Sequence, residues 1–327
     1  MNRLVTIIGG SGFVGRYVAR RMAKEGWRVR VAVRRPNEAL FVRPYGVVGQ
    51  VEPVFCNLRD DASVRAALTG AEAVVNCVGT FDFRGANNFD AVQAEGAGRV
   101  ARIAAELGLA RVVHVSAIGA DAGSRSNYLR TKGEGEAAVL AAFPGAVILR
   151  PSIIFGVEDR FFNRFGAMSR MTPVLPVVGG ATEFQPVYVD DVAQAAVKAV
   201  LGQAQPGIYE LGGPDRDTFR GLMHRMLKII QRRRLVLSLP FWVGAVIATV
   251  FDAIHAGTLG LIPNPVITRD QVRALHVPMT VTPGARGLAD LGIQPTAMEA
   301  VLPEYLWRYR PSGQYAAIKA SARNLRV

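Results

Sequence analysis

The chain has 327 residues, half of them hydrophobic, and a formal net charge of +13. This length and apolar content suit one large domain or two closely packed domains. Two cysteines, Cys56 and Cys77, are too few for a disulfide framework and indicate small core residues in a reducing compartment. With four histidines and no C-x-x-C pair, a metal site has little support.

The first predicted element is a buried strand over residues 4–8 that leads directly into a glycine-rich turn and a helix. Glycines 9, 12 and 15 form a G-x-x-G-x-x-G motif. Such glycines permit a tight turn, let backbone N–H groups approach a pyrophosphate, and let helix pack on strand. The helix N-terminus adds unpaired donors and a positive dipole end. We predict a dinucleotide site, rather than an ordinary turn, with contacts from Gly9, Ser11, Gly12, Phe13, Val14 and Gly15.

Strand and helix signals alternate through the first half of the chain. Strands are predicted at residues 28–33, 51–56, 73–78, 111–116 and 146–149, and the two clearest helices at 87–107 and 128–143. This alternation is typical of a parallel sheet covered on both faces. The fold class is therefore predicted as α/β, with a doubly wound parallel sheet.

After Pro151 the pattern changes. A helix is predicted at 161–171, a strand at 184–189 with a helix at 190–201, a short strand at 207–211, and mostly helices beyond 215. We predict a dinucleotide-binding domain over 1–158 to which 184–213 returns. A smaller, mostly helical C-terminal domain then covers 159–183 and 214–310, and a basic tail covers 311–327.

The second strand ends at Arg34-Arg35, where NAD-selective sites usually place an acid for the ribose 2′-hydroxyl. The sequence has no acid there. Two guanidinium groups suit a 2′-phosphate, which arginine can bind through two hydrogen bonds. The pair therefore predicts NADPH or NADP⁺ over NAD(H), although one arginine could simply be solvated.

The ends of the third and fourth strands supply further candidates. Asn57 and Leu58 are placed near the adenine, although a turn and helix cap explain Asn57 nearly as well. Cys77 and Val78 lead to Gly79, which would let the backbone pass close to the cofactor's sugar and phosphates.

Ser116 ends the fifth strand, and Tyr128 and Lys132 follow on one helix face. A lysine beside the phenol would lower the pKa of the tyrosine and suit it to proton transfer to a carbonyl. The alternative is that Tyr128 and Lys132 only hold the nicotinamide ribose. His114 is interpreted as a packed core residue, and Asp190-Asp191 as a helix cap.

Over residues 3–213 the chain resembles the extended or atypical short-chain dehydrogenase/reductase superfamily. The resemblance rests on the glycine motif, on Ser116 with Tyr128 and Lys132, and on the segments 149–156 and 185–193. Segments 126–136 and 154–165 are more specific. They are similar to a bacterial version of the NADPH-binding Rossmann-fold accessory subunits of respiratory complex I.

The resemblance implies a tightly bound NADPH without catalytic turnover, at the junction of the hydrophilic and membrane arms. It adds Pro151 and Ile153 to the cofactor-binding residues and makes other complex I subunits the expected partners. The implied place is peripheral, on the cytoplasmic face of a bacterial inner membrane, with no signal peptide. Asn57 departs from the aspartate more usual in active relatives.

In the second half, Arg232-Arg233-Arg234 precede a run without charges at 235–251. Pro240 breaks the run, so a transmembrane helix is not expected. Either a strand and a buried core helix follow, or 232–262 contacts an anionic membrane surface, with the arginines at the headgroups. Nucleic acid is not an expected partner, because no aromatic-basic module is apparent.

Two alternative functions remain open at this stage. The first is a soluble NADP(H)-dependent reductase that uses Ser116, Tyr128 and Lys132. The second is a free NADP(H) sensor that belongs to no large complex. By analogy of fold, residues 161–176 are expected to form a lid over any substrate pocket.

Overall fold

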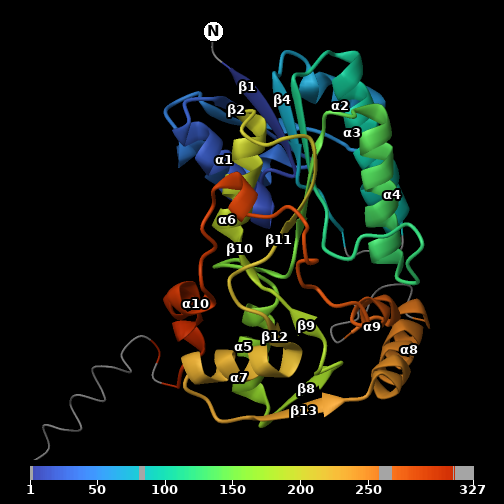
Figure 1. Cartoon of the computed structure of the whole chain (residues 1–327), viewed down its shortest axis with the longest axis vertical. Coiled ribbons are helices and arrows are strands. Elements are labelled where there is room, and N and C mark those ends of the chain that lie inside the picture. Colours follow the sequence, from blue (N-terminus) through green and yellow to red (C-terminus); the bar gives the residue numbers. More distant parts are fainter. Residues whose placement is uncertain (1–2, 81–84, 258–266, 312, 314–327) are drawn as a thin grey trace, which may run out of the picture. The chain divides into compact units, whose positions relative to one another are not determined.

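The structure is a computed structural model that describes residues 3–80, 85–257, 267–311 and 313 (Figure 1). Most of the predicted basic tail, and the end of segment 232–262, lie outside the described residues. The chain forms two compact units. Unit 1 comprises Met1–Ser152, Val189–Gly212 and Val281–Pro295, and unit 2 comprises Ile153–Tyr188, Gly213–Thr280 and Thr296–Val327. The first division falls at Ser152 rather than at residue 158, and unit 1 includes a segment, 281–295, that the sequence assigned to the C-terminal domain.

Unit 1 is built on a seven-stranded sheet in the order β11-β6-β5-β4-β1-β2-β3, with every neighbouring pair parallel. Its strands are β1 (Leu4–Ile8), β2 (Arg28–Val33), β3 (Val51–Phe55), β4 (Ala73–Asn76), β5 (Arg111–Val115), β6 (Val147–Pro151) and β11 (Gly207–Leu211). The order reverses between β1 and β4, where doubly wound sheets bind their ligands beyond the carboxyl ends. The predicted α/β class is confirmed.

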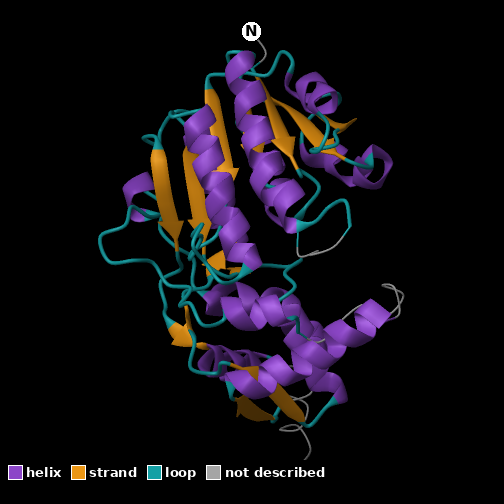
Figure 2. Cartoon of the chain, turned by 90° about the vertical axis from the view of Figure 1, so that its right-hand side faces the viewer, coloured by secondary structure: helices purple, strands orange, loops and turns teal. Residues whose placement is uncertain are grey.

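Helices cover both faces of this sheet (Figures 1 and 2). α1 (Phe13–Lys24) and α6 (Val189–Val200) pack together on one face, and α2 (Asp61–Leu68), α3 (Glu95–Glu106) and α4 (Asn127–Ala142) lie on the other. A 3₁₀ helix η1 (Pro36–Tyr45) follows β2, a π-helical turn η2 (Asp90–Ala94) precedes α3, and η3 (Ala289–Leu291) lies in the last segment. Small buried side chains such as Ala97, Ala101 and Ala104 on α3 let helix and sheet approach closely.

Unit 2 combines short strand pairs with helices around an aromatic core. The strands are β7 (Ile154–Phe155), β8 (Val174–Val178), β9 (Glu183–Phe184), β10 (Val187–Tyr188), β12 (Asp217–Thr218) and β13 (Leu235–Leu239). The helices are α5 (Phe162–Met171), α7 (Phe219–Ile229), α8 (Phe241–Gly257), α9 (Arg269–Ala274), α10 (Met298–Leu306) and η4 (Trp307–Tyr309). Phe161 stacks near Phe162, Phe184 and Phe219, with centroid separations of 5.0 to 6.3 Å.

For the uncharged run after Arg234, the alternative of a strand and a partly buried helix is confirmed, and the membrane contact stays a prediction. Leu235–Leu239 forms β13, which pairs with β8. In α8, Ala248 is fully buried, whereas Trp242, Val246 and Val250 are exposed at four-residue spacing, on one side of the helix. Across the described ranges, no helix is both long and apolar enough to cross a membrane.

Candidate nucleotide-binding site

The glycine-rich turn leaves no room for side chains. Gly9 has φ +75°, and a Cβ on Gly15 would lie 2.4 Å from the Gly9 carbonyl oxygen. α1 begins directly after Gly12, with no side-chain cap and no acidic residue in its first turn. Because no side chain caps these first N–H groups and no acid lies beside them, they can bind an anion. Ser11, Phe13 and Val14 lie at this helix start, as predicted from the motif.

The two arginines after β2 differ in their surroundings. The guanidinium of Arg35 forms an exposed ion pair with Glu38, at 3.0 Å. Arg34 is exposed and has no ion pair or hydrogen bond to any residue that the structure describes. Since a free guanidinium can bind phosphate without breaking another contact, Arg34 is the stronger candidate for a 2′-phosphate.

The residues after β3 and β4 lie along the same carboxyl edge. The Asn57 side-chain oxygen accepts a hydrogen bond from the Arg59 backbone N–H, whereas Asp60, and not Asn57, caps α2. The N–H donors of the Asn57 side-chain amide form no hydrogen bond within the described residues and could bind a ligand. Cys77 continues from β4, its N–H bonded to the Ile8 carbonyl, and a Cβ on Gly79 would lie 3.9 Å from the Lys132 ammonium. Leu58 is packed into the core of unit 1.

Ser116 and Lys132 are brought together with Gly79 by the ends of β5 and α4. The Ser116 hydroxyl is buried and has no hydrogen-bond partner among the described residues. The Lys132 ammonium donates to the Val115 carbonyl at 3.0 Å. Burial lowers the pKa of Lys132 to about 8, although the negative charge of Glu136 raises it in part. Pro151 ends the neighbouring strand, and its carbonyl accepts the Ile118 N–H.

The expectation that Lys132 lowers the pKa of Tyr128 is wrong. Burial raises the pKa of Tyr128 to about 12. The Tyr128 ring packs edge-on against Phe89, at 6.1 Å between centroids, and the Lys132 ammonium donates to the Val115 carbonyl. In this arrangement the phenol is a weak acid that stays protonated at neutral pH.

His114 is a core residue, as predicted. Its Nδ1 lies 3.2 Å from the Asn76 amide nitrogen, and burial lowers the pKa of its imidazole to about 3. The prediction that Asp190 caps a helix is wrong. Asp190 lies inside the first turn of α6, and its carboxylate accepts two hydrogen bonds from Arg21 on α1, at 2.6 and 2.7 Å.

Two residues near this edge were not singled out from the sequence. Arg16, directly after the third glycine, donates to the Ser11 and Gly12 carbonyls. Gln93 is buried in the π-helical turn, donates to the Thr80 carbonyl and leaves its amide oxygen without a partner among the described residues. Because Arg16 directly follows the glycine motif, the sequence could have identified it as a site residue. The place of Gln93 near the site follows only from the tertiary structure.

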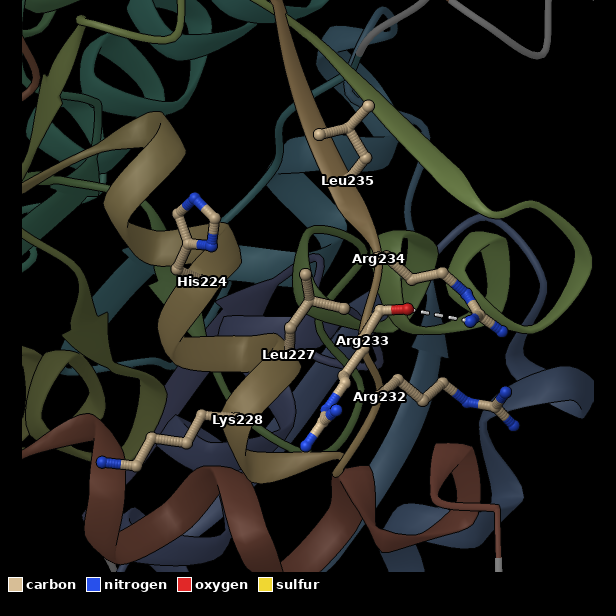
Figure 3. Close-up of a pocket in the computed structure, with 7 residues that line it drawn as sticks. All are labelled: His224, Leu227, Lys228, Arg232, Arg233, Arg234 and Leu235. Carbon is tan, nitrogen blue, oxygen red and sulfur yellow. Dashed lines mark hydrogen bonds between the residues drawn. The ribbon is translucent and has the colours of Figure 1, made fainter.

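Two further predicted features belong to unit 2. Ile153 lies there, so its place in the cofactor site stays a prediction. A basic groove with a volume of about 550 Å³ lies along α7 and the loop after it, and Figure 3 shows the side chains that line it. It is lined by His224, Leu227, Lys228, Arg232, Arg233, Arg234 and Leu235. None of these cations forms an ion pair with a carboxylate within the described part of the chain, and across this part no cluster suits a metal ion.

The residues of unit 1 fit a nicotinamide dinucleotide. Close-approach glycines, an uncapped helix start, an unpaired arginine and an orphaned serine hydroxyl follow one another along the carboxyl edge of β1, β2, β4 and β5. Fold and site therefore define a Rossmann-type dinucleotide-binding protein with the serine, tyrosine and lysine set of the short-chain dehydrogenase/reductases.

Comparison with known proteins gives the family. Residues 5–212 match the NAD dependent epimerase/dehydratase family. The chain is 34% identical to the NADH dehydrogenase [ubiquinone] 1 alpha subcomplex subunit 9 of Arabidopsis thaliana, over 95% of this chain and 79% of that protein. The chain belongs to the NAD dependent epimerase/dehydratase family and, within it, to the family of these alpha subcomplex subunit 9 proteins.

Two other similarities bear on the site. A ceramide reductase of Caulobacter vibrioides is 34% identical over 72% of this chain and 74% of its own length. The solved structure of a dTDP-glucose 4,6-dehydratase from Streptomyces venezuelae has a TM-score of 0.70 and 19% identity, covering 96% of this chain and 99% of that one. The similarity to the dehydratase structure supports the fold. The similarity to the ceramide reductase shows that an enzyme has a related sequence.

Proposed function

We propose that this chain is a non-catalytic accessory subunit of respiratory complex I that holds NADP(H) as a structural ligand. One observation carries the proposal: the similarity to complex I subunits extends over 95% of the chain and so includes unit 2 as well as the nucleotide-binding unit. Its expected place is the junction of the hydrophilic and membrane arms. There it would be peripheral, on the cytoplasmic face of a bacterial inner membrane, with other complex I subunits as partners.

The unpaired Arg34 supports NADP(H) over NAD(H), because its guanidinium faces no competing carboxylate. The raised pKa of Tyr128 supports a holding role over catalysis, because a protonated phenol of pKa about 12 is poorly matched to proton transfer at neutral pH. Tyr128, Lys132 and Ser116 would then bind the nicotinamide ribose.

Co-migration of the chain with the megadalton assembly in native gels of solubilised membranes tests this function. We expect the isolated assembly to contain NADP(H), identified by mass, and Arg34→Glu to lose both the nucleotide and the assembly. A variant that left nucleotide content and assembly unchanged would refute the structural role of the nucleotide. Migration of the chain alone, with nucleotide bound, would instead indicate a free sensor.

A reductase is the second candidate, favoured by the intact Ser116, Tyr128 and Lys132 and by the related ceramide reductase. The assembly isolated above distinguishes the two. A structural ligand predicts no NADPH oxidation with carbonyl or quinone substrates. A reductase predicts consumption that Tyr128→Phe abolishes, since the phenol would donate the proton.

The basic groove supports contact with an anionic membrane surface through 232–262. Its cations lack carboxylate partners among the described residues, and β13 leads from it toward α8 (Figure 1), which carries the exposed Trp242. Basic residues beside exposed apolar ones suit anionic headgroups above acyl chains. The purified protein is expected to bind vesicles that contain anionic lipid and not to bind neutral vesicles. Its affinity for the anionic vesicles should fall as the salt concentration rises. Equal binding to both would exclude the electrostatic contact.

A further inference from the structure

All the large apolar side chains that unit 1 exposes, within its described residues, lie between positions 40 and 55. They are Leu40, Phe41, Val47, Val48 and Phe55, and Val48 is fully exposed. We call this surface the 40–55 face. It is formed by η1, by the turn after it and by β3, the outermost strand of the sheet. Exposed apolar residues gathered in one segment indicate an interaction site more than residues scattered singly do.

The surroundings of the 40–55 face are basic. Arg43 is exposed and has no ion pair among the described residues, whereas Arg34 is assigned to the 2′-phosphate. Arg35 is balanced by Glu38 alone. An apolar surface beside the unpaired Arg43 is complementary to a protein surface with an apolar centre and carboxylates at its rim.

The 40–55 face is also connected to the glycine-rich turn. The Arg16 guanidinium lies 4.9 Å from the centroid of the Phe41 ring. The same group donates to the Ser11 carbonyl at 3.0 Å and to the Gly12 carbonyl at 3.2 Å. One side chain thus contacts both the turn that would bind the pyrophosphate and the exposed aromatic ring on η1.

We propose that the 40–55 face docks a protein subunit with an apolar contact surface rimmed by carboxylates, and that Arg16 couples this docking to the nucleotide. The inference rests on the proposed function and adds to it a docking surface and a physical link. Nucleotide that orders the glycine turn also orders Arg16 and, through it, Phe41. By linkage, docking then tightens nucleotide binding by the same factor as nucleotide tightens docking.

The double variant Val47→Glu/Val48→Glu tests the docking surface. Both side chains are solvent-exposed on a turn, so the purified variant is expected to keep its nucleotide and its melting temperature. It should be lost from the megadalton assembly, because two carboxylates would replace the apolar centre. Gln203→Glu/Gln205→Glu, on an exposed loop of unit 1, adds the same charge elsewhere and should assemble normally.

Normal assembly of Val47→Glu/Val48→Glu would overturn the docking surface while leaving the proposed function intact, whereas failure of the wild-type chain to co-migrate would refute the proposed function. Sedimentation of the purified wild-type protein is expected to give a monomer. A dimer that this double variant dissociates would make a second copy the occupant and would also overturn the proposal.

Arg16→Leu tests the coupling. Nucleotide-loaded wild-type protein is expected to bind membranes that lack the chain about tenfold more tightly than stripped protein, a typical allosteric factor. In Arg16→Leu, which removes both the carbonyl contacts and the contact with Phe41, loaded and stripped protein should bind equally. A variant that keeps the wild-type ratio would show that Arg16 does not carry the coupling.

Discussion

Gly15→Ala is expected to lower the affinity for NADP(H) by at least about a hundredfold, or roughly 3 kcal/mol. The added Cβ would lie 2.4 Å from the Gly9 carbonyl oxygen and 2.7 Å from the Gly10 Cα. Both are backbone atoms of the turn itself, so no side chain can move aside, and the turn must open. An opened turn no longer presents its N–H groups to the pyrophosphate.

Calorimetric titration with NADPH and the nucleotide content of the purified protein measure this loss. The control is Gly145→Ala, whose Cβ meets only the Phe143 ring, at 3.4 Å, and which should bind like the wild type. At a thousand times its Kd, the nucleotide should stabilise the wild type by about 4 kcal/mol and Gly15→Ala by much less. If Gly15→Ala retained stoichiometric nucleotide, the site would lie elsewhere.

The sequence predicted the sheet of unit 1 because its strands are buried on both faces. Val74 and Val75 in β4 are fully buried and therefore appear as continuous apolar runs. Several predicted strand ends erred by one or two residues, as at Cys77, which follows β4 and whose N–H still bonds to the Ile8 carbonyl of the neighbouring strand.

The missed elements depend on distant contacts. No strand was predicted at residues 174–178, which contain Pro176, yet β8 tolerates a proline because it pairs on one side only, with β13. Segment 281–295 has no regular hydrophobic period. It is held in unit 1 by contacts such as the Thr282 N–H to Glu210 and the buried Leu291.

For the candidate site, the motif located the glycines and the serine, tyrosine and lysine set, but it could not predict their electrostatics. Spacing alone places Lys132 on the face of Tyr128. The raised pKa of Tyr128 depends on burial, which is not local in sequence. The proposal of NADP(H) follows from Arg34-Arg35 in the sequence, and the structure adds that Arg34 lacks a partner among the described residues.

Arg150→Met is expected to destabilise unit 1 by about 3–5 kcal/mol, the usual cost of leaving a buried charge without its partner. Glu136 on α4 is 3% exposed, and it accepts hydrogen bonds from the Arg150 Nε and Nη2, at 2.9 and 2.5 Å. Glu210 on β11 lies 3.7 Å from the same guanidinium. One cation therefore neutralises carboxylates from a helix and from a neighbouring strand.

Urea unfolding of the nucleotide-free protein measures this destabilisation. Arg150→Met/Glu136→Gln removes the cation and the Glu136 carboxylate but leaves Glu210 without the cation, so it should recover only the part of the lost stability that belongs to the unpaired Glu136 carboxylate. Arg102→Met, which breaks ion pairs on the exposed side of α3, should cost far less. Equal losses for Arg102→Met and Arg150→Met would show that the buried network does not carry the stability.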